Sequence, residues 1–193
     1  KYGRYDCIVP GSGGKDSCYA AHLLKYKYGM NPLTVTWPPL LYTSYGLQNF
    51  KNWLEIGGFD NISAKRNEVL SKYLTKQSIL NLFHPFQSFM LGQKIFPIRV
   101  AIERKIPLIF YGENEAEHGN SLADNSSSLR SKSFHIRKNL DNIFLGGINL
   151  KDIINAKKFS FKDLSQYLPP DENEIGNFPL EVHYLGFFEK WIP

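Results

Sequence analysis

Short apolar runs alternate with amphipathic stretches through the first half of the chain. Residues 5–10 predict a buried strand, a helix is expected over 17–27, and residues 33–37 predict a second strand that two prolines end. The same patterns predict a helix over 45–56 and a weak strand over 61–64. They continue with a helix that Asn67 caps and that runs to about Leu82, a helix that includes 98–104, and a strand over 107–111. Strands that alternate with helices at this spacing predict an α/β fold, with a Rossmann-like parallel sheet flanked by helices.

The chain divides into three parts by composition. Residues 1–118 carry the strand and helix pattern, whereas 119–139 are rich in Ser and Asn beside basic residues and predict a mobile surface loop or a gap in the chain. Residues 140–193 hold short amphipathic pieces broken by Pro and Gly, which predict a small helical appendage. Ligands of a parallel sheet bind at the carboxyl ends of its strands, so the segment after the first strand, Trp37 and residues 112–114 are expected together at this ligand edge, with the appendage beside it. The chain begins without Met, almost at a strand, so we expect it to be a fragment of a longer protein.

Composition narrows the class of protein. A chain of 193 residues that is 42% hydrophobic fits one α/β domain with a sizeable core and an appendage. Its net charge of +5 is spread along the chain, which favours anionic substrates in general and does not indicate nucleic acid. Cys7 and Cys18 form neither a C-x-x-C pair nor a zinc spacing and are expected to be buried thiols. With neither a signal-peptide pattern nor a long apolar run, a cytoplasmic protein without a membrane span is expected.

The segment after the first strand carries the clearest chemical signal. It reads Ser12-Gly13-Gly14-Lys15-Asp16-Ser17. Two glycines let the backbone turn and leave room for a ligand, and the N–H groups at the start of the following helix suit an anion. Lys15 adds a positive charge and the serine hydroxyls add donors, so the segment predicts a phosphate-binding loop. A glycine and serine turn without a ligand is the alternative.

Two commoner phosphate-binding motifs do not fit this segment. A P-loop would need Gly at position 9 and Ser or Thr at position 16, where the chain has Val9 and Asp16. A dinucleotide-binding motif that starts at Gly11 would need Gly at position 16 as well. The motif S-G-G-x-D-S after a strand instead resembles the pyrophosphate loop of the ATP pyrophosphatases, also called the PP-loop superfamily. Those proteins have a HUP-like sheet and cleave ATP between its α- and β-phosphates.

Three downstream segments resemble one family of that superfamily, the N-acetyl sugar amidotransferases of bacterial surface-polysaccharide biosynthesis (lipopolysaccharide and O-antigen). They read FQSFMLGQKIFP over 86–97, IPLIFYGEN over 106–114 and EVHYLGFFEKW over 181–191. With the loop, the resemblance covers nearly the whole chain. Many relatives carry a cysteine-rich N-terminal segment, and some have a C-x-x-C where this chain has Phe86 and Phe89. We therefore expect no zinc site built from thiolates.

The resemblance implies a reaction and its partners. The carbonyl oxygen of a sugar N-acetyl group attacks the α-phosphate of ATP, giving an O-adenylyl imidate and pyrophosphate, and ammonia then displaces AMP to leave an acetamidino group. ATP and Mg²⁺ are the implied cofactors, and the substrate is expected to be a nucleotide-linked acetamido sugar. The chain has no Cys/His glutaminase arrangement, so ammonia should come from separate subunits similar to the glutaminase and cyclase of imidazole glycerol phosphate synthase.

Each candidate residue has an expected role and a simpler alternative. The loop, Ser12 to Ser17, is expected to hold the phosphates that leave as pyrophosphate, with Lys15 and Asp16 as candidate catalytic residues. Asp16 is expected either to orient Lys15 or to cap the helix. Main-chain groups over 34–37, including Thr36 and Trp37, are expected to bind adenine, and the alternative for Trp37 is a place in the core. Gly112 is expected to contact the cofactor, Glu113 to bind Mg²⁺ and Asn114 to bind phosphate or substrate; the alternative for Glu113 and Asn114 is a turn at the strand end. Gln93 and Lys94 are expected to bind the sugar, with solvated side chains as the alternative, and His84 and His118 are weaker candidates.

Two other classes of function stay open at this point. A PP-loop enzyme that modifies tRNA would bind tRNA with an affinity that falls steeply with salt. A non-catalytic nucleotide-binding module would bind ATP without releasing AMP. Thiolation of tRNA would need a cysteine partner that neither Cys7 nor Cys18 has at a suitable spacing.

Overall fold

A parallel sheet forms the centre of the computed structural model, which describes residues 4–112, 128–130, 132–137 and 139–190. Five parallel strands lie in the order β3-β2-β1-β4-β8, and β5 joins β8 antiparallel at the edge. The order is that of a Rossmann-like, HUP-like fold and confirms the predicted class. The strands are β1 (Cys7–Pro10), β2 (Pro32–Thr36), β3 (Asn61–Ser63), β4 (Leu108–Tyr111), β5 (Leu129–Arg130) and β8 (Glu181–Tyr184).

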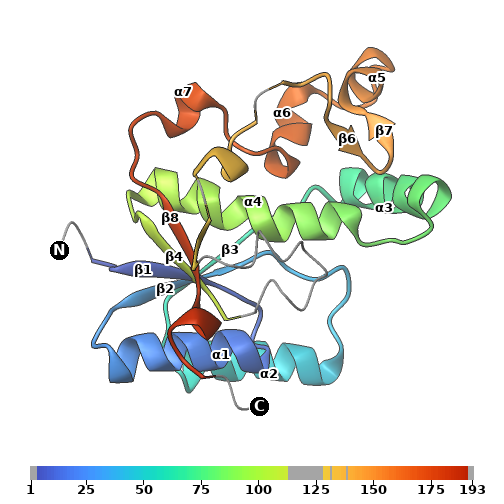
Figure 1. Ribbon diagram of the computed structural model, residues 1–193. Coiled ribbons are helices and arrows are strands. Elements are labelled where there is room, and N and C mark those ends of the chain that lie inside the picture. The colour runs from blue at the N-terminus through green and yellow to red at the C-terminus, as the bar shows by residue number, and fades with distance from the viewer. Residues whose placement is uncertain (1–3, 113–127, 131, 138, 191–193) are drawn as a thin grey trace.

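Helices cover both faces of this sheet. Figure 1 shows α1 and α2 below the sheet and α3 and α4 above it. Their bounds are α1 (Lys15–His22), which continues into the π-helical turn η1 (Leu23–Lys27), α2 (Ser44–Glu55), α3 (Glu68–Leu82) and α4 (Gln87–Arg104). The Asn67 side chain accepts a hydrogen bond from the Leu70 N–H at 3.1 Å, as expected of a helix N-cap.

A second layer lies on the outer side of α4 (Figure 1). It consists of the hairpin β6 (Phe144–Leu145) and β7 (Ile148–Asn149), helices α5 (Leu150–Asn155), α6 (Phe161–Leu164) and α7 (Glu172–Ile175), and 3₁₀ turns η3 (Lys132–His135) and η4 (Ser165–Tyr167). A further 3₁₀ turn, η5 (Leu185–Phe187), follows β8. In the part of the chain that the structure describes, every helix is too short or too polar to cross a membrane.

The long helix α4 begins earlier than the sequence pattern indicates. Pro97 lies inside it, although a proline removes one helical hydrogen bond and usually ends or bends a helix. The helix continues because it buries one side chain after another against the sheet, including Ile98, Val100 and Ala101. Burial of this apolar surface outweighs the cost of the proline, which is about 3 kcal/mol in a helix interior.

Strand β8 lies within the range that the sequence assigns to the helical appendage. It runs parallel to β4, with Val182 beside Ile109. Val182 and Leu180 belong to the same buried cluster as Ile8 and Ile109, so this segment completes the main core. The C-terminal part of the chain therefore contributes a strand to the central sheet as well as helices to the outer layer.

Candidate functional site

The loop between β1 and α1 has the glycine-dependent shape that its sequence indicates. Gly13 has φ +87°, a region that other residues rarely adopt. A β-carbon on Gly13 would lie 2.7 Å from the backbone nitrogen of Phe50 in α2, so a side chain has no room there. A β-carbon on Gly14 would meet no atom of the described residues within 4 Å. The loop is thus closed against α2 at Gly13 and open at Gly14, where a ligand has space.

Helix α1 begins directly behind this opening. Its N-cap is Gly14, whose carbonyl oxygen accepts hydrogen bonds from the Cys18 N–H and the Ser17 hydroxyl, both at 3.0 Å. The N–H groups of the first helical turn have no acceptor within the helix, and the helix dipole makes this end positive. Ser17 is buried and its hydroxyl proton is directed at Gly14, so its main-chain N–H is the group better placed for an anion.

Lys15 and Asp16 lie at the mouth of the loop. The Lys15 ammonium donates to Oδ1 of Asp16 at 3.0 Å, and about 69% of the Lys15 side chain is exposed. Of the two roles expected of Asp16, the structure contains the contact with Lys15, while the N-cap position is Gly14, where no side chain of the described residues caps the helix. An exposed pair of this kind adds little to stability, and it leaves the ammonium group beside the helix start.

The end of β4 meets the loop, as predicted from the parallel sheet. A β-carbon on Gly112 would lie 2.3 Å from the carbonyl oxygen of Asp16, and one on Gly11 would lie 2.2 Å from the β-carbon of Ser17. Both glycines therefore allow backbone to approach the first turn of α1 closely. Glu113 and Asn114, the candidate Mg²⁺ and phosphate ligands that follow Gly112, lie outside the described residues, as does His118.

A chain of buried hydrogen bonds ties β3 and β2 to the loop. The Asn61 amide donates to the hydroxyl oxygens of Thr34 at 2.9 Å and Thr36 at 3.0 Å. The Thr36 hydroxyl in turn donates to the carbonyl oxygen of Gly11 at 2.7 Å, and the Thr34 hydroxyl donates to that of Asp60 at 2.7 Å. Thr36 thus acts on the loop through its side chain and positions Gly11.

Sequence reasoning missed Asn61. The signal that was available is the pair of hydroxyl side chains at alternate positions, Thr34 and Thr36, in a strand that is otherwise apolar. Both are fully buried, and buried hydroxyls need partners. The partner could not be named, because it comes from the next strand and depends on the β2–β3 register.

Trp37 is a core residue. It is 5% exposed and packs edge-on against Tyr167, with ring centroids 5.5 Å apart, and beside Phe96. A β-carbon on Gly92 of α4 would lie 2.0 Å from the indole ring, so the helix lies directly on it. The alternative that placed this side chain in the core agrees with these contacts.

The candidate sugar-binding residues lie on α4. Gln93 and Lys94 are both exposed. The Tyr111 hydroxyl, at the end of β4, donates to the Gln93 carbonyl oxygen at 3.4 Å, which brings Gln93 to the same edge of the sheet as Gly112. His84 lies in the turn between α3 and α4, where its Nδ1 accepts the Phe86 N–H at 3.2 Å. This contact gives His84 a local structural role.

Burial keeps both thiols protonated at neutral pH. It raises the pKa of Cys7, in the centre of the sheet, to about 12, with a smaller contribution from the charge of Asp6. Burial also raises the pKa of Cys18 on α1. The two cysteines are free. Since the thiolate is the reactive form, neither has the environment of an activated nucleophile.

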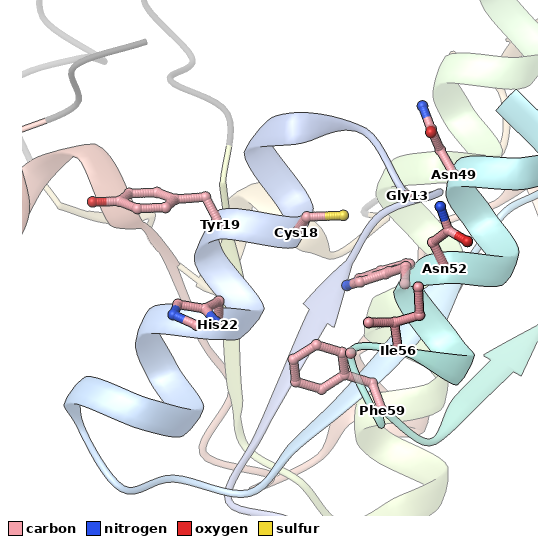
Figure 2. Close-up of a pocket in the computed structure, with 10 residues that line it drawn as sticks. Gly13, Cys18, Tyr19, His22, Asn49, Asn52, Ile56 and Phe59 are labelled. Atoms are coloured by element: carbon pink, nitrogen blue, oxygen red, sulfur yellow. The ribbon is translucent and has the colours of Figure 1, made fainter. Parts of the chain in front are cut away.

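A pocket of about 420 Å³ that is open to solvent, here called the cavity, lies between α1 and α2, with Gly13 at one end and Phe59 in its wall (Figure 2). It adjoins the loop but is separate from the exposed candidates Gln93 and Lys94. Within the described ranges, no group of three or more His, Cys, Asp or Glu side chains is arranged to hold a metal ion. Comparison of the chain with models of protein families and with curated proteins gave no match.

Proposed function

We propose that this protein is an ATP-dependent amidotransferase of the PP-loop type, which forms AMP and pyrophosphate and converts the acetamido group of a nucleotide-linked sugar into an acetamidino group. The observation that carries the proposal is the loop between β1 and α1. Its glycines, its open side at Gly14, the N–H groups of the helix start, which have no acceptor within the helix, and the Lys15 ammonium together fit a pyrophosphate group.

The residues of the loop would divide the work of holding the phosphates. The N–H groups over 14–17 would bind phosphate oxygens, and the Lys15 ammonium would offset the negative charge that builds up on departing pyrophosphate. Asp16 would hold Lys15 in place through the 3.0 Å contact. Thr36 would keep Gly11, and with it the loop, in a fixed position. These roles are positioning and charge stabilisation, which is what transfer from a phosphate requires.

Bound ATP would supply the adenylyl group that turns a poor leaving group, an amide oxygen, into a good one. Ammonia would then add to the same carbon, and AMP would depart with the original oxygen. Gln93 and Lys94 at the ligand edge would bind the sugar, while Glu113 would bind Mg²⁺ through its carboxylate and Asn114 a phosphate oxygen. Ammonia would come from a separate glutaminase subunit in the cytoplasm.

The chemistry of the two cysteines supports this reaction over tRNA thiolation. A thiolation enzyme of this superfamily usually needs a cysteine that carries a persulfide or forms a disulfide. Cys7 is buried in the sheet with a pKa raised to about 12, and burial raises the pKa of Cys18. Attack on an adenylated amide by ammonia needs no such thiol.

The deciding experiment measures AMP and pyrophosphate released from ATP with Mg²⁺ and a high ammonium concentration. The panel of acceptors contains nucleotide-linked diacetamido sugars and bulk tRNA, and mass spectrometry examines each product. We expect AMP only with an acetamido sugar, and a product in which NH replaces the amide oxygen. AMP that depends on tRNA would indicate RNA modification instead. ATP binding without AMP from any acceptor would indicate a binding module.

A further inference from the structure

The cavity between α1 and α2 is uncharged, and rings form much of its wall. Figure 2 shows Asn49 and Asn52 of α2, with Ile56 directly after this helix, on one side and Cys18 and His22 of α1 on the other. The described residues that line it include no Asp, Glu, Lys or Arg. A volume of about 420 Å³ is in the range of small-molecule sites. Its chemistry suits a neutral, flat ligand with polar edges.

A buried donor at this cavity has no acceptor. Trp53 lines it and is 3% exposed, yet its indole Nε1–H has no hydrogen-bond partner among the described residues. An unsatisfied buried N–H is unusual in a folded protein and destabilises it. The ring also approaches the phosphate-binding loop, because a β-carbon on Gly11 would lie 3.0 Å from its edge. Trp53 therefore connects the cavity to the loop.

The carboxamides of α2 can recognise the edge of a heterocycle. Oδ1 of Asn52 accepts from Gln48 Nε2 at 2.9 Å, which leaves its NH₂ group to donate to a ligand. Asn49 is exposed at the end of the cavity nearest Gly13. A carboxamide offers a hydrogen-bond donor and an acceptor side by side, and this pattern pairs with the edge of adenine. Aromatic side chains such as Phe59 pack against the faces of bases.

We propose that this cavity is a nucleobase site. The base belongs either to ATP or to the nucleotide that carries the sugar. The inference rests on the proposed function in one respect, which is that the protein binds a nucleotide. It departs from the sequence-based expectation that main-chain groups over 34–37 bind adenine. Strand β2 is internal, and main-chain groups of residues 34–36 are used by neighbouring segments: the Thr34 N–H donates to Asp60, Val35 accepts from Gly11 and Thr36 accepts from Ala64.

The test separates the base from the phosphates. Ligand-observed NMR on the chain measures binding of adenosine, uridine and, with Mg²⁺, ATP and pyrophosphate. The variants Asn49→Leu and Asn52→Leu remove the carboxamides, and Asn155→Leu makes the same change at an exposed position of α5 as a control. We expect a loss of about tenfold or more in nucleoside affinity for either cavity variant, unchanged pyrophosphate binding, and no effect of the control.

Each outcome bears on one proposal. Binding of adenosine that the cavity variants weaken supports an ATP base in the cavity, and binding of uridine that they weaken supports the carrier nucleotide. Nucleoside or ATP affinity that both variants leave unchanged overturns the cavity assignment, as does pyrophosphate binding with no nucleoside binding. Those results would leave the proposed function standing. A chain that binds neither ATP nor pyrophosphate would overturn the proposed function itself.

Discussion

The two faces of the sheet are covered in different ways. On one face α4 crosses β1, β2 and β4, and it is enclosed between two buried clusters, one against the sheet and one formed with α3 and the outer layer. On the other face α1 and α2 share a single smaller cluster and leave a cavity between them (Figures 1 and 2). Apolar side chains buried around α4 stabilise the fold, whereas the space between α1 and α2, next to Gly13, is available to a ligand.

The difference is visible in how each face uses glycine. Gly92 on the α4 face lets a helix lie against the ring of Trp37, which is a packing role. Gly13 and Gly112 on the other side shape the loop and let strand ends approach α1, while Gly14 opens to solvent. Substitutions that disturb one face should therefore change stability, and substitutions at the loop should change chemistry.

The largest expected effect is at Lys15. Replacement by Met removes the charge that offsets departing pyrophosphate, so AMP release should fall by about a hundredfold or more, with the thermal unfolding midpoint unchanged. The matched control is Lys51→Met on the exposed side of α2. Wild-type rates of AMP release in the Lys15 variant would rule out this role of the loop.

A substitution in the enclosed face should act on stability. Gly92→Ala places a methyl group about 2.0 Å from the Trp37 ring, where the buried cluster cannot easily move aside. We expect a loss of about 1–3 kcal/mol in the free energy of unfolding, measured by urea denaturation. Gly186→Ala is the control, because a β-carbon there meets no atom within 4 Å in the part of the chain that the structure describes. Equal stability of both variants would contradict the tight packing of α4.

Thr36→Val tests the link between the sheet and the loop. Valine keeps the shape but removes the hydroxyl that donates to the Gly11 carbonyl and leaves the Asn61 amide with Thr34 as its remaining acceptor of the two, so we expect a loss of about 1–3 kcal/mol in stability and a higher KM for ATP. Thr75→Val is the control, because the Thr75 hydroxyl is buried without a partner among the described residues. A variant that loses stability with an unchanged KM would leave Thr36 a purely structural role.

The smallest effect concerns Cys18. Because burial raises its thiol pKa, the thiolate fraction at neutral pH is lower than for an ordinary cysteine. The rate at which iodoacetamide alkylates Cys18 near neutral pH should therefore be lower in the folded protein than in the protein unfolded in urea. As the pH is raised, this rate should increase at a higher pH in the folded protein than in the unfolded one. Cys7 should react only after unfolding. Equal pH profiles for Cys18 in the folded and unfolded states would contradict the raised pKa.

Local patterns were enough to place the loop and most elements around it. The apolar runs of β1, β2 and β4, the capping residue Asn67 and the glycines at 13 and 14 all act through their immediate neighbours in sequence. The start of α4 over 87–97 was not assigned from the sequence, and its continuation through Pro97 depends on burial against a sheet that forms elsewhere. Asn61 was missed because its partners depend on strand register.

The sequence by itself determined the α/β class and the position of the candidate phosphate-binding loop, because apolar periodicity and the backbone freedom of glycine are properties of short segments. Only the tertiary structure decided that β8 completes the sheet, that the Trp37 side chain is buried beneath Gly92, and that α1 and α2 leave a cavity next to Gly13. These features arise from contacts between residues far apart in the chain, whose energies depend on the packing of the whole molecule.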